Sequence, residues 1–178
     1  MAVVRFDLTV AGFPACPCAG IVVEPVDPAH ALGDLTAIAS TGGGQTAEAE
    51  MALRPGGLAA EVTSRPGREV WAWIAREHAK ASRPLGFLTL VRAGSLAVPR
   101  WSIGWLVVEP AARRRGIGTA LVATAVRFAG ARGASIVHAE TLEKWPAAVA
   151  FWAAARLAAL SHLATLGASG ESRKTAEG

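Results

Sequence analysis

The chain has 178 residues, of which 52% are hydrophobic and 18% are charged, and its formal net charge at pH 7 is +4. This balance predicts a folded protein with a sizeable core and excludes an intrinsically disordered chain. Fifteen of the eighteen basic residues are arginine, but they form no stripe that would indicate binding to nucleic acid. The most apolar segment, residues 147–168, is interrupted by Arg156 and His162, so we expect no membrane span and no membrane partner.

The N-terminal segment and the two cysteines favour a cytoplasmic protein. Arg5 and Asp7 interrupt the N-terminal segment, so it lacks the apolar stretch of a secretory signal. Cys16 and Cys18 are the only cysteines, and they are too close together for an easy disulfide. No further cluster of cysteine or histidine completes a metal site. We therefore expect two reduced thiols and no metal, with a redox or metal role as the less favoured alternative.

The N-terminal part of the chain predicts two strands and a helix. Alternating apolar residues indicate strands at Val3–Val10 and Ile21–Val26. Asp27 can cap a following helix in which Pro28 is the first residue, since both residue types are favoured at those positions. We expect this helix to end near Ala39.

The next segment is rich in glycine and turns. Thr41–Gly44 predicts a flexible link rather than a phosphate-binding loop, because no strand precedes it. A second, weaker helix is predicted at Thr46–Leu53. Arg54–Gly67 contains two turns built from proline and glycine and is expected to be mostly loop.

The rest of the chain alternates strands and helices. The predicted elements are strands at Glu69–Arg76, Leu85–Arg92 and Trp101–Val108, a helix at Ile117–Gly130, a strand at Ser135–Thr141 and a helix from Pro146 to about Ala155. Turn residues separate the first three strands, which favours an antiparallel meander. The strand after the helix is expected to run parallel to the strand before it, as in other strand–helix–strand crossovers.

The C-terminal end has a less regular pattern than the rest of the chain. Beyond Leu157 the pattern fits either a continued helix or a short strand at Leu160–Leu166. One domain is expected over residues 1–167, in which residues 1–20 supply an extra N-terminal strand and its connection. Residues 168–178 predict a polar tail.

The most informative stretch is Arg113–Leu121, which follows a predicted strand and begins a predicted helix. Helix N-termini carry unpaired N–H groups and a partial positive charge, so they bind phosphate, and glycine lets a ligand approach the backbone. A P-loop is excluded because no Gly-Lys-Ser/Thr occurs, and Leu121 stands where a dinucleotide fingerprint has its third glycine. The stretch predicts a site for a pyrophosphate-bearing cofactor, and a basic surface turn before an ordinary helix is the alternative.

Two flanking patterns carry a resemblance to a known family. Leu106–Pro110 followed by Arg113-x-x-Gly116-x-Gly118 resembles motif A of the GNAT N-acetyltransferases. Ala148-x-x-Phe151-Trp152 resembles the family's Asn-x-x-Ala-x-x-Phe-Tyr helix. The likeness extends from about residue 69 to residue 157. It implies the GNAT fold, an α/β fold in which helices cover both faces of a twisted mixed sheet and two parallel core strands, here about 101–108 and 135–141, splay apart.

The resemblance assigns acetyl-CoA as the acyl donor. Backbone groups of Leu106 and Val108 would hold the acetyl group and pantetheine arm, and N–H groups from Arg114 to Thr119 would hold the pyrophosphate. Unpaired N–H groups of a splayed strand suit the oxyanion that forms during acyl transfer. The full set of expected cofactor-binding residues is Leu106, Val107, Val108, Arg113, Arg114, Arg115, Gly116, Ile117, Gly118, Thr119, Trp145 and Trp152.

The implied chemistry is transfer of an acetyl group to an amine, which must lose a proton before it attacks. Glu140 is the candidate base, because the ribosomal-protein N-terminal acetyltransferases of this family place a glutamate five residues before the helix Asn, whose position Trp145 occupies here. His138 lies on the same strand face and could relay or tune the proton. A carboxylate that simply faces water and a packed histidine are the structural alternatives.

Two departures from the family pattern bear on activity. Trp145 replaces the usual Asn, and Trp152 replaces the tyrosine that commonly protonates the leaving thiolate; the chain contains no tyrosine. An indole is a donor only and cannot serve as that acid. We therefore expect an N-acetyltransferase acting on a small amine or a peptide N-terminus, with an acyl-CoA-binding module of little turnover as the alternative. If the family's last strand is missing, a second copy of the chain could cover the sheet edge in a homodimer.

Overall fold

The structure is a computed structural model that describes residues 2–14, 18–42, 58–78, 83–95 and 97–174. The chain divides into two units, each with strands of its own. One unit comprises Met1–Ala15 with Val126–Gly178, and the other comprises Cys16–Ala125. We refer to them as the terminal unit and the central unit.

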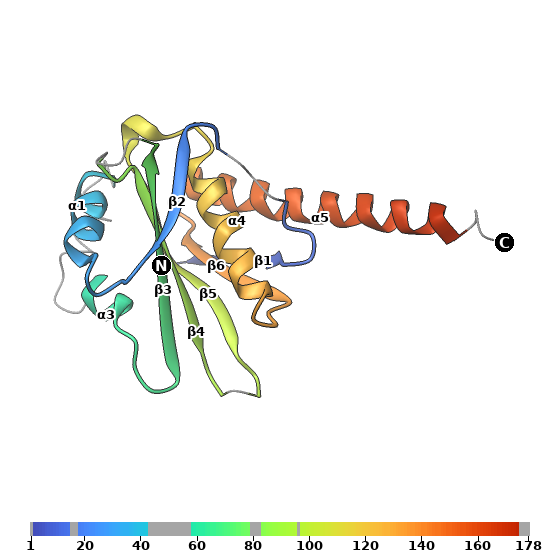
Figure 1. The fold of residues 1–178 in the computed structure, drawn as a ribbon, viewed down its shortest axis with the longest axis horizontal. Helices are drawn as coiled ribbons and strands as arrows, with labels where there is room; N and C mark the ends of the chain where they lie inside the picture. The colour runs from blue at the N-terminus through green and yellow to red at the C-terminus, as the bar shows by residue number, and fades with distance from the viewer. Residues whose placement is uncertain (1, 15–17, 43–57, 79–82, 96, 175–178) are drawn as a thin grey trace. The chain divides into compact units, whose positions relative to one another are not determined.

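The central unit is built on antiparallel strands (Figure 1). Their spatial order follows the chain: β2 (Ile21–Val26), β3 (Arg68–Glu77), β4 (Gly86–Ala93) and β5 (Arg100–Val108). The predicted strands in these regions and the antiparallel meander are confirmed. Their boundaries agree with the sequence pattern to within one residue, because alternating apolar residues and the intervening turns define them locally.

Two helices, α1 (Leu32–Gly42) and α3 (Leu58–Val62), supply five of the eight buried residues of an apolar cluster in the central unit. Helix residues such as Leu35 and Leu58 are buried against Phe87 and Val107 of the sheet, and Trp105 packs on the edge of this cluster. Helix α3 lies within the stretch predicted to be mostly loop, and the sequence pattern did not predict this short helix. Burial of Leu58 and Val62 explains the helix, because tertiary packing stabilises short helices that propensity alone does not.

The beginning and end of α1 also differ from prediction. Asp27 accepts hydrogen bonds from the N–H groups of Ala29 and His30, but this cap stabilises a turn, and the regular helix begins at Leu32. The hydrogen bond with the His30 side chain, followed by those from the backbone, lowers the pKa of Asp27. The helix then includes part of the predicted link, through Gly42, because glycine is well tolerated at a helix C-terminus. The predicted helix at Thr46–Leu53 lies outside the described residues.

A bulge interrupts the pairing of β4 with β5. The register shifts between Leu88 and Leu90, and the fully buried Thr89 lies at the shift. Its hydroxyl oxygen accepts a hydrogen bond of 2.8 Å from the N–H of Trp105. A Cβ atom on Gly104 would come within 2.8 Å of the same oxygen. The bulge thus requires both a hydroxyl on one strand and a glycine on the other.

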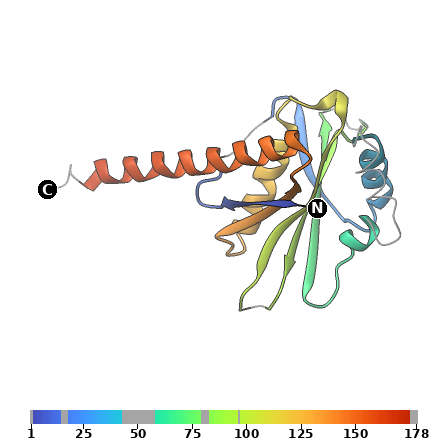
Figure 2. The ribbon, with the colours of Figure 1, turned by 180° about the vertical axis from the view of Figure 1, so that it is seen from behind.

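The terminal unit contains an antiparallel pair of strands (Figure 2). Strand β1 (Val3–Thr9) pairs with β6 (Ile136–Leu142). Strands in these two regions were predicted, but their pairing was not. Helix α4 (Ile117–Gly130) starts in the central unit and ends in this one, and a Cβ atom at Gly130 would meet the Val10 side chain at 2.4 Å. Because β5 and β6 belong to different units, their splaying stays a prediction.

Helix α5 (Pro146–Lys174) is the longest helix described, and it packs against β1 and β6. The sequence pattern predicts a helix to about Ala155 and, beyond Leu157, either a continued helix or a short strand. The structure has the continued helix, which also extends into the segment for which composition predicts a polar tail. Buried Trp152, Ala155 and Ala159 recur at intervals of three and four residues, which is the spacing of one helix face. Within the described residues, no helix combines the length and apolar character needed to cross a membrane.

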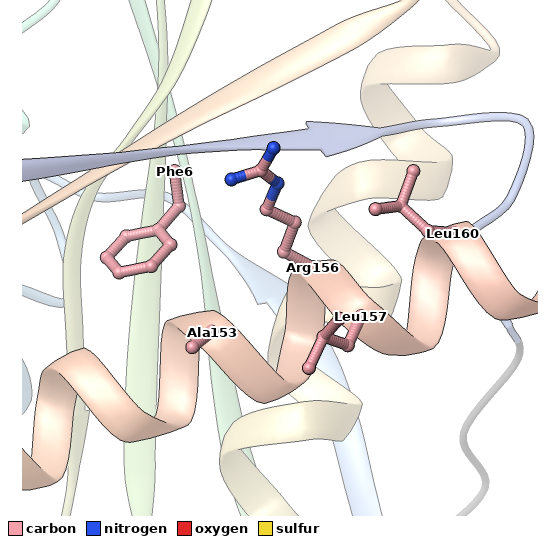
Figure 3. Close-up of a pocket in the computed structure, with 5 residues that line it drawn as sticks. All are labelled: Phe6, Ala153, Arg156, Leu157 and Leu160. Atoms are coloured by element: carbon pink, nitrogen blue, oxygen red, sulfur yellow. The ribbon is translucent and has the colours of Figure 1, made fainter.

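An open, mostly apolar pocket lies between β1 and α5 (Figure 3). Its lining consists of Phe6, Ala153, Arg156, Leu157 and Leu160. The side chains of Leu157 and Leu160 are largely exposed. None of the residues predicted to bind the cofactor or to act in catalysis lines this pocket.

The bulge generates the first prediction. Thr89→Val should lower the free energy of unfolding by about 1–3 kcal/mol, because the Trp105 N–H would lose its acceptor in a buried position. Thr124→Val is a matched control, since the Thr124 hydroxyl only donates to the Ala120 carbonyl within a helix. Urea unfolding of both variants measures the difference. Equal losses of stability would show that the Thr89 hydroxyl is not required by the bulge.

Candidate functional site

The segment between β5 and α4 is an exposed turn that leads into the start of a helix. After Val108, a short 3₁₀ turn (Pro110–Ala112) leads into the arginine triplet, and α4 begins at Ile117. The N–H of Ala120 donates to the Gly116 carbonyl. The N–H groups of Ile117–Thr119 precede this bond and form the first turn of the helix, where a helix provides no acceptors of its own. The turn can therefore offer donors to an anion.

Gly116 makes this turn conformationally feasible. Its φ is +79°, in the left-handed region that glycine adopts without penalty. A Cβ atom added at this residue would have the Cys18 Sγ as its nearest neighbour, at 3.6 Å, which is an ordinary contact. Glycine is therefore required by the backbone conformation rather than by crowding. Arg114 is also left-handed, with φ at 64°, and it is the one described residue other than glycine with a positive φ.

The three arginines of the turn have different surroundings. Arg113 donates from Nε to the Val108 carbonyl at 3.1 Å, and Arg115 forms an ion pair of 2.9 Å with Glu77. Within the described part of the chain, no hydrogen bond or ion pair involves the side chain of Arg114. Two arginines thus help to shape the turn, and the third is available to a ligand.

Cys18 adds a contact that the sequence did not predict. Its thiol lies 2.7 Å from the Arg115 carbonyl, to which it donates, and the residue is partly buried. The contact links the segment before β2 to the arginine turn, although nearly a hundred residues separate the two partners in the chain. Cys18 is a free thiol, and Cys16 lies outside the described residues.

The end of β5 presents backbone groups in two directions. The N–H of Glu109 donates to the Leu85 carbonyl at 2.8 Å, and neighbouring residues along an antiparallel strand alternate in direction. The N–H and C=O groups of Leu106 and Val108 therefore point away from β4. The Val107 side chain is buried in the apolar cluster, so its contribution to the site is structural support.

Glu109 anchors this strand end. Its side chain is mostly buried and forms an ion pair with Arg83, and the residue precedes the 3₁₀ turn. Gly86 allows the same strands to approach closely, because a Cβ atom there would come within 2.7 Å of the Val107 carbonyl. These contacts hold the strand from which the cofactor-binding groups were predicted to project.

The predicted catalytic residues lie in the terminal unit. His138 and Glu140 share one face of β6, while Val137, Ala139 and Thr141 are buried on the other, so the period-two prediction is confirmed. The Glu140 carboxylate accepts two hydrogen bonds from Arg5, at 2.8 and 2.6 Å. His138 Nδ1 lies 2.8 Å from the Asp7 carboxylate.

Arg5 and Asp7 are the polar partners that sequence reasoning missed. Their alternation in β1 matches that of His138 and Glu140 in β6, and the register pairs Arg5 with Glu140 and Asp7 with His138. The alternation of charged residues in both strands could have indicated that they face each other. Which residue pairs with which, however, depends on the strand register, and only the structure shows that register. Among the described residues, no three His, Cys, Asp or Glu side chains are grouped so as to hold a metal ion.

The two tryptophans assigned to the cofactor occupy different environments. Trp145 is half-buried and precedes α5, where its carbonyl accepts hydrogen bonds from the N–H groups of Ala148 and Val149. Trp152 is 5% exposed and makes an edge-to-face contact with Phe151 at 4.9 Å between ring centres. Its burial fits a packing role in the terminal unit.

The left-handed turn generates the second prediction. Gly116→Ala should lower the free energy of unfolding by about 1–2 kcal/mol, because an L-residue is strained at this φ. The matched control is Gly33→Ala in α1, where φ is not left-handed and no atom lies within 4 Å of the new Cβ; stability there should rise by about 0.4–1 kcal/mol. Urea unfolding measures both, and a neutral or stabilising effect at Gly116 would contradict the argument.

Solved structures similar to this one include a tandem GNAT protein from the clavulanic acid biosynthesis pathway. It matches with a TM-score of 0.60 and 16% identity over 86% of this chain and 48% of the other, so this chain spans about half the length of the tandem protein. Two aminoglycoside acetyltransferases from uncultured soil metagenomic samples also match. Their TM-scores are 0.54 and 0.58, with 24% and 17% identity, over 74% and 77% of this chain and 87% and 88% of theirs.

These likenesses establish the GNAT fold, which confirms the predicted fold class. A search of curated proteins found no significant match. The sequence model of the acetyltransferase (GNAT) family matches residues 45–156, which is more than half of the chain. That range includes β5, the arginine turn, α4 and β6. The chain therefore belongs to the GNAT acetyltransferase family.

Proposed function

We propose that this protein transfers the acetyl group of acetyl-CoA to an amine. The observation that carries the proposal is the first turn of α4, whose N–H groups precede the first helical hydrogen bond and which follows β5, the arginine triplet and the left-handed Gly116 in a chain of this family. A helix N-terminus beside arginine side chains suits a pyrophosphate. The proposal thus joins family membership to a local anion-binding geometry.

The residues of the turn fit the phosphate part of acetyl-CoA. The N–H groups of Ile117–Thr119 would donate to phosphate oxygens, and the Arg114 side chain would add positive charge. Gly116 itself is exposed and carries no side chain, so a ligand could approach the backbone there. When bound, acetyl-CoA supplies an activated acetyl thioester.

The protein's own groups would support transfer in two ways. Backbone N–H groups of Leu106 and Val108 point away from β4 and would stabilise negative charge on the acetyl oxygen. A group on the polar face of β6, where His138 and Glu140 lie, would accept the amine proton. The predicted contribution of Trp145 and Trp152 to cofactor binding remains part of the proposal.

A binding module with little turnover is the second candidate. It is favoured by one specific observation: the position of the family's tyrosine is held by Trp152, which is buried and cannot donate a phenolic proton. A thiolate is nevertheless a tolerable leaving group near neutral pH, because thiols ionise with a pKa of about 8.5. Loss of the tyrosine therefore need not abolish transfer.

The third prediction tests turnover. Incubation with acetyl-CoA and a panel of amines should release thiol above the background of hydrolysis for at least one amine. The panel contains small primary amines, peptides with open N-termini and an aminoglycoside, because two similar structures carry that last name. Tight binding of acetyl-CoA without thiol release from any amine would favour the binding module instead.

The fourth prediction tests the cofactor loop. Arg115→Glu combined with Gly116→Asp should greatly weaken binding of acetyl-CoA in calorimetry, since both changes put negative charge where phosphate would lie. Arg65→Glu reverses a charge in the same unit outside the turn and should bind as the unaltered protein does. Circular dichroism checks that the double variant is folded. Unchanged affinity in a folded double variant would refute the loop assignment.

A further inference from the structure

Four ionisable side chains form two adjacent cross-strand pairs on one face of the β1–β6 ribbon. Asp7 lies opposite His138 and Arg5 lies opposite Glu140. The Asp7 carboxylate is 2.8 Å from His138 Nδ1, and Arg5 is 2.6 Å from the Glu140 carboxylate. The opposite face of the ribbon is apolar, with Phe6 and Leu8 buried. The ribbon thus separates a packing face from a polar face.

The two pairs differ in what they leave available for chemistry. Both Nε and Nη2 of Arg5 donate to a single oxygen of Glu140, so the negative charge of this carboxylate is compensated by a cation. An imidazole whose Nδ1–H donates to a carboxylate keeps its lone pair on Nε2. No hydrogen bond joins His138 Nε2 to any described residue. His138 Nε2 is therefore a basic atom without a partner among the described residues, whereas the charge of Glu140 is already paired with that of Arg5.

We propose that His138 is the proton acceptor of the reaction and that Asp7 is its positioning residue. This inference rests on the proposed function, and it chooses between the two β6 candidates. Asp7 would hold the tautomer with Nδ1 protonated and would stabilise the imidazolium that forms. Arg5 would hold Glu140 beside the pair, so that the carboxylate contributes to the electrostatics of the face without accepting the proton.

Protons and electron pairs balance over one turnover. An ammonium substrate passes one proton to His138 Nε2, which becomes imidazolium. The amine lone pair then forms the new C–N bond at the acetyl carbonyl, and the C–S bond breaks with its electron pair retained by sulfur. The nitrogen releases a second proton, which neutralises the thiolate through solvent. Imidazolium returns its proton to water, so each turnover yields an amide and a thiol from an amine and a thioester.

The chain offers a matched control for Asp7. Asp34 is also a half-exposed carboxylate in an ion pair, with 52% of its side chain exposed against 54% for Asp7. It pairs with Arg76 at 3.0 Å in the central unit. Asp34→Asn and Asp7→Asn therefore remove the same charge from similar environments, and only the second affects a histidine.

The experiment compares unaltered protein with the Asp7→Asn, Asp7→Glu, His138→Gln and Asp34→Asn variants, using an amine that the panel identifies. We expect kcat to fall by about 10²-fold or more in His138→Gln and by about 10-fold or more in Asp7→Asn. The KM for acetyl-CoA should change little, and Asp7→Glu should recover part of the loss. In nitrogen-15 spectra of the imidazoles, the His138 resonances should report Nδ1 protonation and shift in Asp7→Asn.

Each alternative outcome has a distinct meaning. If Asp7→Asn behaves as Asp34→Asn does in kcat and leaves the His138 resonances unchanged, the positioning role of Asp7 is overturned. If His138→Gln retains full kcat, the histidine is not the acceptor. If the unaltered protein binds acetyl-CoA but transfers acetyl to no amine, the proposed function fails, and the proposed roles of His138 and Asp7 fail with it. Thermal unfolding of each variant separates these results from loss of folding.

Discussion

The left-handed backbone at Gly116 is the constraint on which the rest of the proposed cofactor site depends. At this residue the chain leaves the turn after β5 and enters α4, with φ at +79°. Residues other than glycine are strained in this region, so the position restricts the residue type without any crowding by neighbours. The conformation leaves the N–H groups of Ile117–Thr119 at the start of the helix. Donors for a phosphate are thus produced by backbone geometry, and the side chains adjust what that geometry already provides.

The three arginines of the turn differ in whether their side chains stabilise the turn or are left for a ligand. Arg115 is paired with Glu77, and Arg113 donates to the carbonyl at the end of β5. Cys18 adds a hydrogen bond to the Arg115 carbonyl from a distant part of the chain. Such contacts hold the turn in place before a ligand binds, which reduces the ordering cost of binding. Arg114 lacks a comparable partner among the described residues, so the proposed function assigns its charge to phosphate.

The β1–β6 ribbon shows a second division of roles, in this case between two faces. Phe6 and Leu8 are buried, together with Val137 and Ala139, and these side chains stabilise the terminal unit. The alternate residues carry the Asp7–His138 and Arg5–Glu140 pairs. Cross-strand ion pairs also stabilise sheets modestly, so the structural and chemical roles of these side chains overlap. The available Nε2 of His138 is what distinguishes the histidine pair from an ordinary cross-strand ion pair.

Sequence by itself determined the features that depend on local periodicity and turn chemistry. The strands at β1 to β6, helix α4 and the glycine-dependent turn at Gly116 follow from residue spacing, because period two, period 3.6 and a left-handed glycine are local properties. Only the tertiary structure decided the features that depend on packing or register. Burial of Leu58 and Val62 stabilises α3 where turn residues predicted a loop, and packing on β1 and β6 accompanies the extension of α5 beyond Ala155. Arg5 and Asp7 gained their partners for the same reason: residues more than a hundred positions apart meet only when β1 pairs with β6 in one register.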